Sequence, residues 1–143
     1  MGQHTWVMVR LVLICMLMGC QPSGSTEQRI ANLSLEFVAK GGLSEGPEGP
    51  ANRVAALLAL VRQGAFRQGM SARQVRDVLG EPDSVWHDPP DNRYDLRYLY
   101  VLGSVDDLEV FFKNDRLLEM DRIVDGPTEL GGGLYALRLP EEH

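Results

Sequence analysis

The sequence lacks several features that would point directly to a function. Its 143 residues include only two cysteines, too few for a disulfide scaffold. Acidic residues outnumber basic ones by 20 to 14, giving a formal net charge of −6. This argues against a nucleic-acid-binding protein, because neutralising phosphates needs a basic surface. No apolar run approaches the ~20 residues that span a bilayer. With 44% apolar and 24% charged residues, the composition is that of a folded protein with one modest domain.

Residue patterns that carry chemistry are also scarce. The three histidines have no cysteine, glutamate or second histidine at metal-ligand spacing; they are His4, His87 and His143. Four oxygen-bearing side chains fall within eight residues, namely Asp88, Asp91, Asn92 and Asp95. They offer oxygen ligands for calcium but lack the spacing and central glycine of an EF-hand loop, so a solvated acidic loop is the favoured interpretation. Nothing sets up a nucleophile, a base and an orienting group. We therefore expect no enzyme, no metal and no cofactor.

The first twenty residues are typical of a targeting segment. Arg10 precedes the apolar run Leu11–Met18, which is too short to cross a membrane, and Gly19 and Cys20 follow. This ending resembles a bacterial lipobox, with cleavage before Cys20 and acylation of its thiol. The resemblance implies a signal peptide over residues 1–19 and a lipid attachment site at Cys20. Gln21 stands where an aspartate is associated with inner-membrane retention, so the resemblance favours the periplasmic face of the outer membrane.

Residues 20–50 are expected to be the acylated N-terminus, a tether and a linker rich in glycine and proline. Within them, Ile30, Leu33 and Phe37 repeat at helical spacing, although Leu33, Leu35 and Phe37 also alternate. We interpret this segment as a helix.

Two further helices are predicted from stronger signals. Apolar residues at i, i+3, i+4 and i+7 predict an amphipathic helix over residues 52–63. A second helix begins at Ser71, where Gln74 completes a capping box. It ends at Gly80, expected to be a left-handed C-cap, and Pro82 prevents its continuation.

Beyond Pro82 the pattern changes to alternation. Tyr94–Tyr100, Leu108–Phe112 and Leu118–Met120 predict three strands, and a tight hairpin is expected over Lys113–Arg116. Ser84–His87 is a candidate for an additional extended segment, and Leu134–Leu139 for a late edge strand. The predicted fold is α+β: two helices packed on a three-stranded antiparallel sheet, in a domain over residues 51–125. Residues 126–143 are expected to be a flexible tail.

Residues 69–83, which read Gly-Met-Ser-Ala-Arg-Gln-Val-Arg-Asp-Val-Leu-Gly-Glu-Pro-Asp, resemble the signature of the SmpA/OmlA family. That family includes the BamE-like small lipoproteins of outer-membrane β-barrel assembly. Tyr98–Tyr100 and Val110–Leu117 resemble its strand pair, although Asp115 replaces the usual hairpin glycine. The resemblance covers about residues 51–123. It implies a lipid-anchored envelope protein that contacts other envelope proteins and supports barrel assembly or envelope integrity.

Charge is unevenly distributed along this region. Residues 51–79 carry five arginines against Asp77 alone, whereas residues 80–125 carry five basic and twelve acidic side chains. This favours a basic helical surface toward anionic headgroups or an acidic partner, with the acidic sheet turned elsewhere. The alternative is that charged residues on solvent-exposed faces are unevenly distributed along the chain and serve no binding function. Arg73, Arg76 and Phe111 are the candidate partner-binding residues, Phe111 being expected on the outer side of the sheet.

The sequence thus favours a lipid-anchored periplasmic protein-interaction module whose partners are membrane lipid, through Cys20, and envelope proteins. The alternative is a stand-alone ligand-binding or enzyme-inhibitor-like lipoprotein unconnected with barrel assembly. A third, less favoured class is a small hydrolase with a carboxylate pair in the 88–95 region.

Overall fold

A computed structural model describes residues 24–39 and 49–141 of the chain. Three helices precede the sheet: α2 (Thr26–Ala39), α3 (Gly49–Arg62) and α4 (Ala72–Leu79). Five strands follow, and a short 3₁₀ turn, η1 (Thr128–Leu130), lies between the last two of them. The strands are β1 (Ser84–His87), β2 (Leu96–Gly103), β3 (Asp106–Lys113), β4 (Arg116–Val124) and β5 (Gly133–Ala136). The predicted signal peptide and Cys20 lie outside the described residues.

Helix α4 begins and ends where the sequence predicts. The capping box is confirmed: the Ser71 hydroxyl accepts the N–H of Gln74, and the Gln74 side chain accepts the N–H of Ser71. Gly80 ends the helix with a φ of 77° but a ψ of −170°, so its φ is positive while its ψ is extended rather than left-handed helical. Few residues other than glycine adopt this conformation, so the abrupt change of chain direction after α4 depends on Gly80.

The sheet is a simple antiparallel meander with the strand order β1-β2-β3-β4-β5. Strands β3 and β4 join through the predicted hairpin, in which Asn114 and Asp115 both have positive φ, as a two-residue turn requires. Leu118 forms a bulge in β4, which turns Leu117 and Met120 toward the core, where the sequence predicted Leu118 and Met120.

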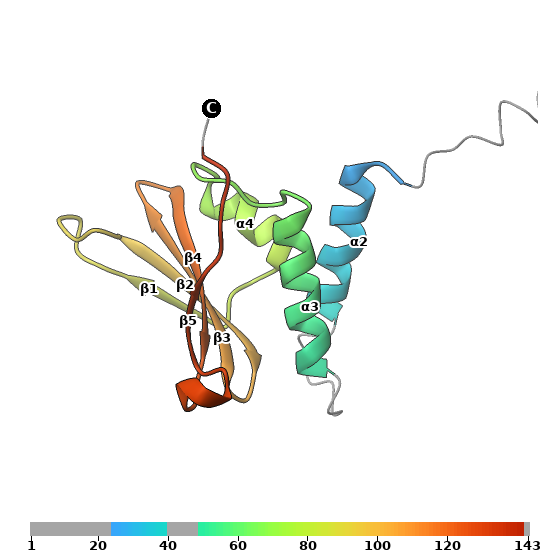
Figure 1. Cartoon of the computed structure of the whole chain (residues 1–143). Helices are drawn as coiled ribbons and strands as arrows, with labels where there is room; N and C mark the ends of the chain where they lie inside the picture. The colour runs from blue at the N-terminus through green and yellow to red at the C-terminus, as the bar shows by residue number, and fades with distance from the viewer. Residues whose placement is uncertain (1–23, 40–48, 142–143) are drawn as a thin grey trace, which may run out of the picture.

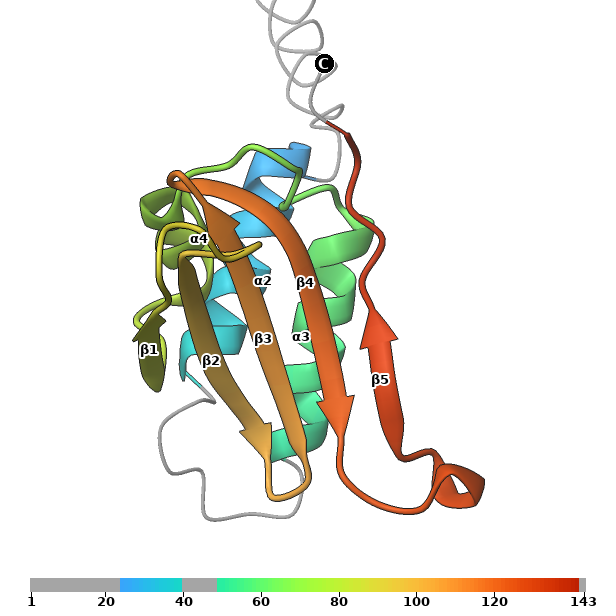
Figure 2. The same cartoon turned by 90° about the vertical axis from the view of Figure 1, so that its left-hand side faces the viewer.

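All three helices lie on one side of the sheet (Figure 1), and Figure 2 looks onto the other side. The core fills the space between the two layers. Its largest side chains are Phe37 of α2, Leu57 and Leu60 of α3, Phe66, Leu79 of α4, and Tyr98, Tyr100, Val110, Phe112 and Met120 of the sheet. The Phe37 and Tyr100 rings meet edge to face at 6.2 Å, so α2 is part of the packed body.

The predicted count of two helices on three strands is wrong, although the α+β class holds. The described residues form three helices and five strands. The two strands beyond the predicted three are short edge strands: β1 coincides with the candidate segment Ser84–His87, and β5 overlaps the candidate Leu134–Leu139. Their residues are mostly exposed, so they show little apolar alternation. They belong to the sheet through backbone pairing with β2 and β4, which the side-chain pattern does not encode.

Candidate functional site

One side of the sheet faces away from the three helices of the described chain (Figures 1 and 2). We call it the open face. Strand register arranges its side chains in rows that cross the sheet. One row is Trp86, Arg97, Phe111 and Glu119; the next is Ser84, Leu99, Glu109, Asp121 and Ala136; the third is Val101, Asp107, Ile123 and Leu134. Among the described residues no helix covers these rows (Figures 1 and 2).

An aromatic–arginine cluster occupies the first row and the β1–β2 loop; its members are Trp86, Arg93, Tyr94, Arg97 and Phe111. Arg97 stacks over the Trp86 ring, with its guanidinium carbon 5.3 Å from the ring centroid. The same guanidinium donates to both carboxylate oxygens of Asp88, at 2.8 and 3.3 Å. This two-point contact with an acid, together with stacking on a ring, fixes the side chain in one orientation.

Phe111 is only 8% exposed because Tyr94 covers it, with their ring centroids 4.6 Å apart. The Tyr94 hydroxyl donates to a carboxylate oxygen of Glu119, and Arg93 donates to the other oxygen at 3.1 Å. Desolvation and then this hydrogen bond raise the pKa of Tyr94 to about 12. The hydroxyl therefore stays protonated at physiological pH, and the ring is held in place over Phe111.

These groups surround a shallow cleft of about 370 Å³ lined by Asp88, Asn92, Arg93, Tyr94, Arg97 and Phe111. The sequence predicted that Tyr94 shares a face with Leu96, Tyr98 and Tyr100. The structure overturns that placement: Tyr94 lies before β2, which begins at Leu96, and its ring packs on the opposite face.

The other two rows carry an acidic strip, defined by Asp107, Glu109 and Asp121. Glu109 of β3 lies directly opposite Asp121 of β4. Desolvation, followed by the charges of Asp125, Asp106 and Asp83, raises the pKa of Asp107. Desolvation and then the charge of Glu119 raise the pKa of Asp121. The strip therefore concentrates negative charge on a partly desolvated surface.

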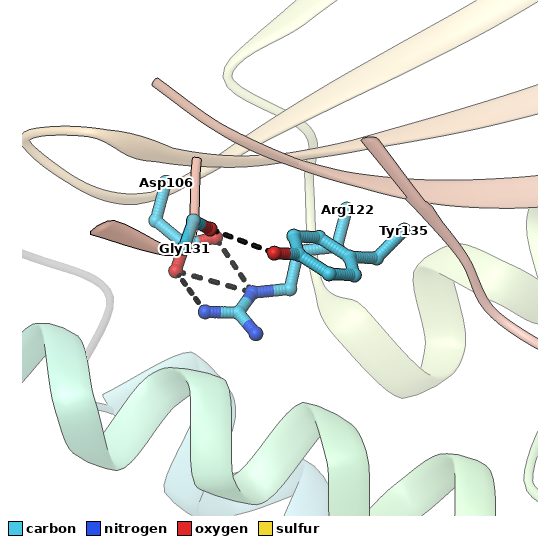
Figure 3. Close-up of polar contacts among 4 residues, drawn as sticks. All are labelled: Asp106, Arg122, Gly131 and Tyr135. Atoms are coloured by element: carbon cyan, nitrogen blue, oxygen red, sulfur yellow. Dashed lines mark hydrogen bonds and ion pairs between the residues drawn. The ribbon is translucent and has the colours of Figure 1, made fainter. Parts of the chain in front are cut away.

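A second polar cluster lies on the helix side of the sheet, across β3, β4 and β5 (Figure 3). Arg122 donates to both oxygens of Asp106, at distances between 2.5 and 3.1 Å, across β3 and β4. Tyr135 of β5 lies opposite Arg122, and its hydroxyl donates to the Gly131 carbonyl at 2.7 Å. The ion pair joins β3 to β4, and the tyrosine joins β5 to the turn that precedes it, with the Tyr135 position paired to Arg122.

The three candidate partner-binding residues do not form one site. Arg73 is exposed on α4, and Arg76 of the same helix lies 3.7 Å from Glu81. Phe111 lies in the open face, on the other side of the sheet from α4. Arg53, which the charge count placed in a basic helical surface, is only 8% exposed: it donates to the Val101 carbonyl and stacks on Phe37.

Two of the three carboxylates in the acidic loop of residues 88–95 have partners within the domain. Asp88 pairs with Arg97, and Asp95 accepts the N–H of Asn114 at 2.9 Å. Within residues 24–39 and 49–141 no three His, Cys, Asp or Glu side chains are grouped so as to hold a metal ion. Residues 42–46 match the Gly-x-Ser-x-Gly pattern of hydrolase elbows and lie outside the described part. They stand between helices α2 and α3, whereas an elbow follows a strand.

A second cavity, of about 530 Å³, lies between the α3–α4 connection and the C-terminal residues Pro140 and Glu141. Its lining is mainly backbone and flexible polar side chains, and it holds no member of the open face. The Gln68 N–H donates to the Pro140 carbonyl across it, which ties the C-terminal segment to the α3–α4 connection.

Sequence reasoning missed four members of the aromatic–arginine cluster: Trp86, Arg93, Tyr94 and Arg97. The signal for Arg97 was present, because the strand alternation that placed Phe111 outward also places Arg97 on the side away from Tyr98. Trp86 becomes visible only once β1 is paired with β2. Tyr94 and Arg93 depend on the path of an irregular loop, which no periodicity encodes.

Comparison with protein-family models, with curated proteins and with solved structures found no match to this chain. The SmpA/OmlA resemblance therefore stays a prediction from the residues quoted above. No helix of the described residues is long and apolar enough to cross a membrane. The fold and the open face define a small α+β domain with three helices on one side of a five-stranded antiparallel meander and an aromatic–arginine cluster on the other.

Proposed function

We propose that this protein is a lipid-anchored protein-interaction module of the bacterial envelope that binds its partner through the open face. The observation that carries the proposal is the aromatic–arginine cluster. Tryptophan, tyrosine and arginine dominate the binding energy of protein interfaces because they offer large contact areas with few rotatable bonds. Here stacking and ion pairs hold them in position before any partner arrives.

Two members of the cluster remain available to a partner. Trp86 is 38% exposed, and the Arg93 side chain is 75% exposed. Phe111 has a different role from the one its sequence position predicts: it supports Tyr94 and forms part of the cleft, rather than inserting into a partner. Arg73 and Arg76 lie on the helix side and belong to a different surface.

The envelope location rests on the lipobox resemblance at Cys20, and the barrel-assembly role rests on the SmpA/OmlA resemblance. Cys20 precedes Gly24, the first described residue, by four positions. An extended chain of that length reaches at most about 14 Å, so an acylated Cys20 would keep the domain close to the headgroups. A Cys20→Ser protein that still incorporates labelled fatty acid would disprove the anchor.

The interaction role is tested by affinity purification of the tagged, acylated full chain from the organism that encodes it, after gentle detergent extraction. We expect barrel-assembly components to co-purify, and Trp86→Ala with Arg93→Ala to reduce their recovery at least about tenfold. Leu35→Ala is the matched control, because Leu35 is 68% exposed on α2, away from the sheet.

Equal recovery with the cluster variant and with wild type would reject the open face as the binding surface. Recovery of a periplasmic enzyme or a small ligand in place of assembly components would instead support the stand-alone inhibitor-like or ligand-binding module.

A further inference from the structure

We propose that the partner of the open face presents a strip of lysine and arginine side chains, which bind the acidic strip Asp107, Glu109 and Asp121. This inference rests on the proposed function and specifies the chemistry of the partner. It concerns rows of the open face that the aromatic–arginine cluster does not occupy.

The acidic strip differs from the other carboxylates of the sheet in forming no ion pair, although the charge of Arg93 acts on Asp121 from a distance and opposes the rise in its pKa. Asp106 is held by Arg122, Glu119 by Arg93 and Tyr94, and Asp88 by Arg97. In the described part of the chain, no hydrogen bond or ion pair reaches the side chains of the acidic strip. Three charges of one sign are therefore left without an ion pair on a surface where Asp88 and Glu119 are paired with arginines.

The position of these carboxylates makes their charge costly without a partner. All three are half-buried, and Glu109 directly faces Asp121 across the β3–β4 pair. Like charges in such a cross-strand pair repel each other. The raised pKa values of Asp107 and Asp121 have the same cause, a partly desolvated site among other acids. Cationic side chains placed over the strip would relieve both the repulsion and the desolvation.

Apolar side chains border the acidic strip. They favour a protein rather than a free metal ion as the partner that binds it. Leu99 lies beside Glu109, Val101 beside Asp107, and Ile123 on the other side of Asp107. Val101 is 42% exposed. A surface that alternates carboxylates with aliphatic groups matches lysine and arginine well, because their apolar stems can lie on the aliphatic groups while their charged ends reach the carboxylates.

A second copy of this chain is the less suitable occupant. Three of its exposed arginines, Arg62, Arg67 and Arg73, lie on the helix side or in the α3–α4 connection, whereas Arg93 belongs to the aromatic–arginine cluster of the open face itself. A contact between that side of one copy and the open face of the next joins two different surfaces, and such contacts close into a ring only at particular angles. Anionic lipid is excluded as an occupant by the sign of the strip's charge.

The test is photo-crosslinking of the acylated full chain in the organism that encodes it. A photoreactive residue replaces Val101 next to the acidic strip, and in a second strain it replaces Trp86 in the cluster. Crosslinked peptides are identified by mass spectrometry. We expect the Val101 position to crosslink to a segment rich in lysine and arginine. Glu109→Lys with Asp121→Lys should lower that yield at least about tenfold, as should raising the salt to about 0.5 M in isolated envelopes.

Two further variants separate binding from folding. Glu109→Gln with Asp121→Asn removes the charge without new repulsion, and it should lower the yield less than the lysine variant does. Glu36→Lys with Asp77→Lys makes the same change in charge on exposed residues of α2 and α4, and it should leave the yield unchanged.

The outcomes separate this inference from the proposed function. A crosslink at Val101 that is insensitive to charge reversal and salt, or a captured segment without basic residues, would overturn the acidic-strip proposal and leave the interaction role standing. So would a crosslink to residues 62–76 or to Arg93 of a second copy of the protein, which would identify that copy as the occupant. Crosslinks from neither Val101 nor Trp86 would overturn both.

Discussion

Asp115 serves two structural needs at the scale of a single residue. It is the second residue of the β3–β4 turn, where its φ is 58°. Its carboxylate also accepts the N–H of Ala72, at 3.0 Å, in the first turn of α4. A glycine at this position would suit the turn but leave that N–H without the side-chain acceptor. The departure from Asn-Gly at the hairpin therefore has a physical reason: this turn also caps a helix 43 residues earlier in the chain.

Replacing Asp115 separates these two needs. Asp115→Ala loses the helix cap and keeps a positive φ that alanine tolerates poorly, so we expect the free energy of unfolding to fall by about 1–2 kcal/mol. Asp115→Asn retains a side-chain oxygen and tolerates the same φ, and it should lose far less. Urea denaturation of both variants checks this. Equal losses for alanine and asparagine would mean that the carboxylate charge, rather than the cap, carries the effect.

Asp121 provides a pH-dependent prediction. Its pKa in the folded protein is raised above the ordinary value of 3.8, chiefly by desolvation and by Glu119. The native state therefore holds more protons than the unfolded chain between the two pKa values, and stability falls as the pH rises through that interval. The destabilisation is complete at neutral pH and disappears in acid. We expect Asp121→Asn to raise the stability at pH 7 by a few tenths to about 1 kcal/mol, and to lose this gain near pH 3.

Thermal unfolding of wild type and Asp121→Asn across that pH range measures the difference directly, and taking the difference cancels the other titrating groups. Glu129→Gln is the control, because Glu129 is an exposed acid on η1 outside the acidic strip. A gain that persists at pH 3 would show that packing, and not charge, is responsible.

At the scale of elements, the predictions from sequence succeeded where local chemistry decides the structure. The capping box of α4 and the turn at Asn114 and Asp115 involve neighbours in the chain, and both are confirmed. The edge strands were predicted only as candidate segments and were left out of the predicted sheet, because their place in it depends on backbone pairing with distant strands. Leu118 was placed inward because strict alternation cannot anticipate a bulge.

In the candidate site, too, the sequence predicted what local pattern decides and missed what distant contacts decide. Alternation from Tyr98 and Val110 correctly placed Phe111 on the outer side of the sheet. It could not show that Tyr94 covers Phe111, because Tyr94 reaches it from a loop. Arg53 was counted as a surface charge, although its side chain is buried against Phe37 through a contact between two different helices. Periodicity assigns a face to a residue but not the neighbour that covers it.

The contribution of the Asp106–Arg122 ion pair to this part of the sheet, including the neighbouring strand β5, can be tested by substitution. Arg122→Leu leaves the Asp106 carboxylate without its ion pair in a side chain that is only 13% exposed. We expect a loss of about 2–3 kcal/mol in the free energy of unfolding, and faster hydrogen exchange in β5 than in β2. Asp106→Asn combined with Arg122→Leu removes the unpaired carboxylate charge and should recover part of that lost stability. If β5 amides exchange at the wild-type rate in Arg122→Leu, the ion pair does not hold this strand.

At the scale of the whole molecule, the start of α2 and the α3–α4 connection lie at one end, and the β2–β3 turn lies at the other (Figures 1 and 2). With an acylated Cys20 only four residues before Gly24, the tether can hold just the first of these ends near the membrane. Under the proposed anchoring, the strands and helices would run away from the bilayer and the open face would point sideways, away from the headgroups. A partner would reach the aromatic–arginine cluster and the acidic strip without competing with lipid.

This orientation predicts a gradient of proximity to the membrane along the molecule. For the acylated chain in nanodiscs with headgroup spin-labelled lipid, we expect stronger paramagnetic broadening of amides at Gln68, in the α3–α4 connection, than at Ser104, in the β2–β3 turn. Inserting about 20 Gly and Ser residues after Cys20 lengthens the tether several-fold and should reduce the difference, because the domain then samples many orientations. Equal broadening at Gln68 and Ser104 with the natural tether would contradict an upright domain. The open face would then have to compete with the headgroups for its partner.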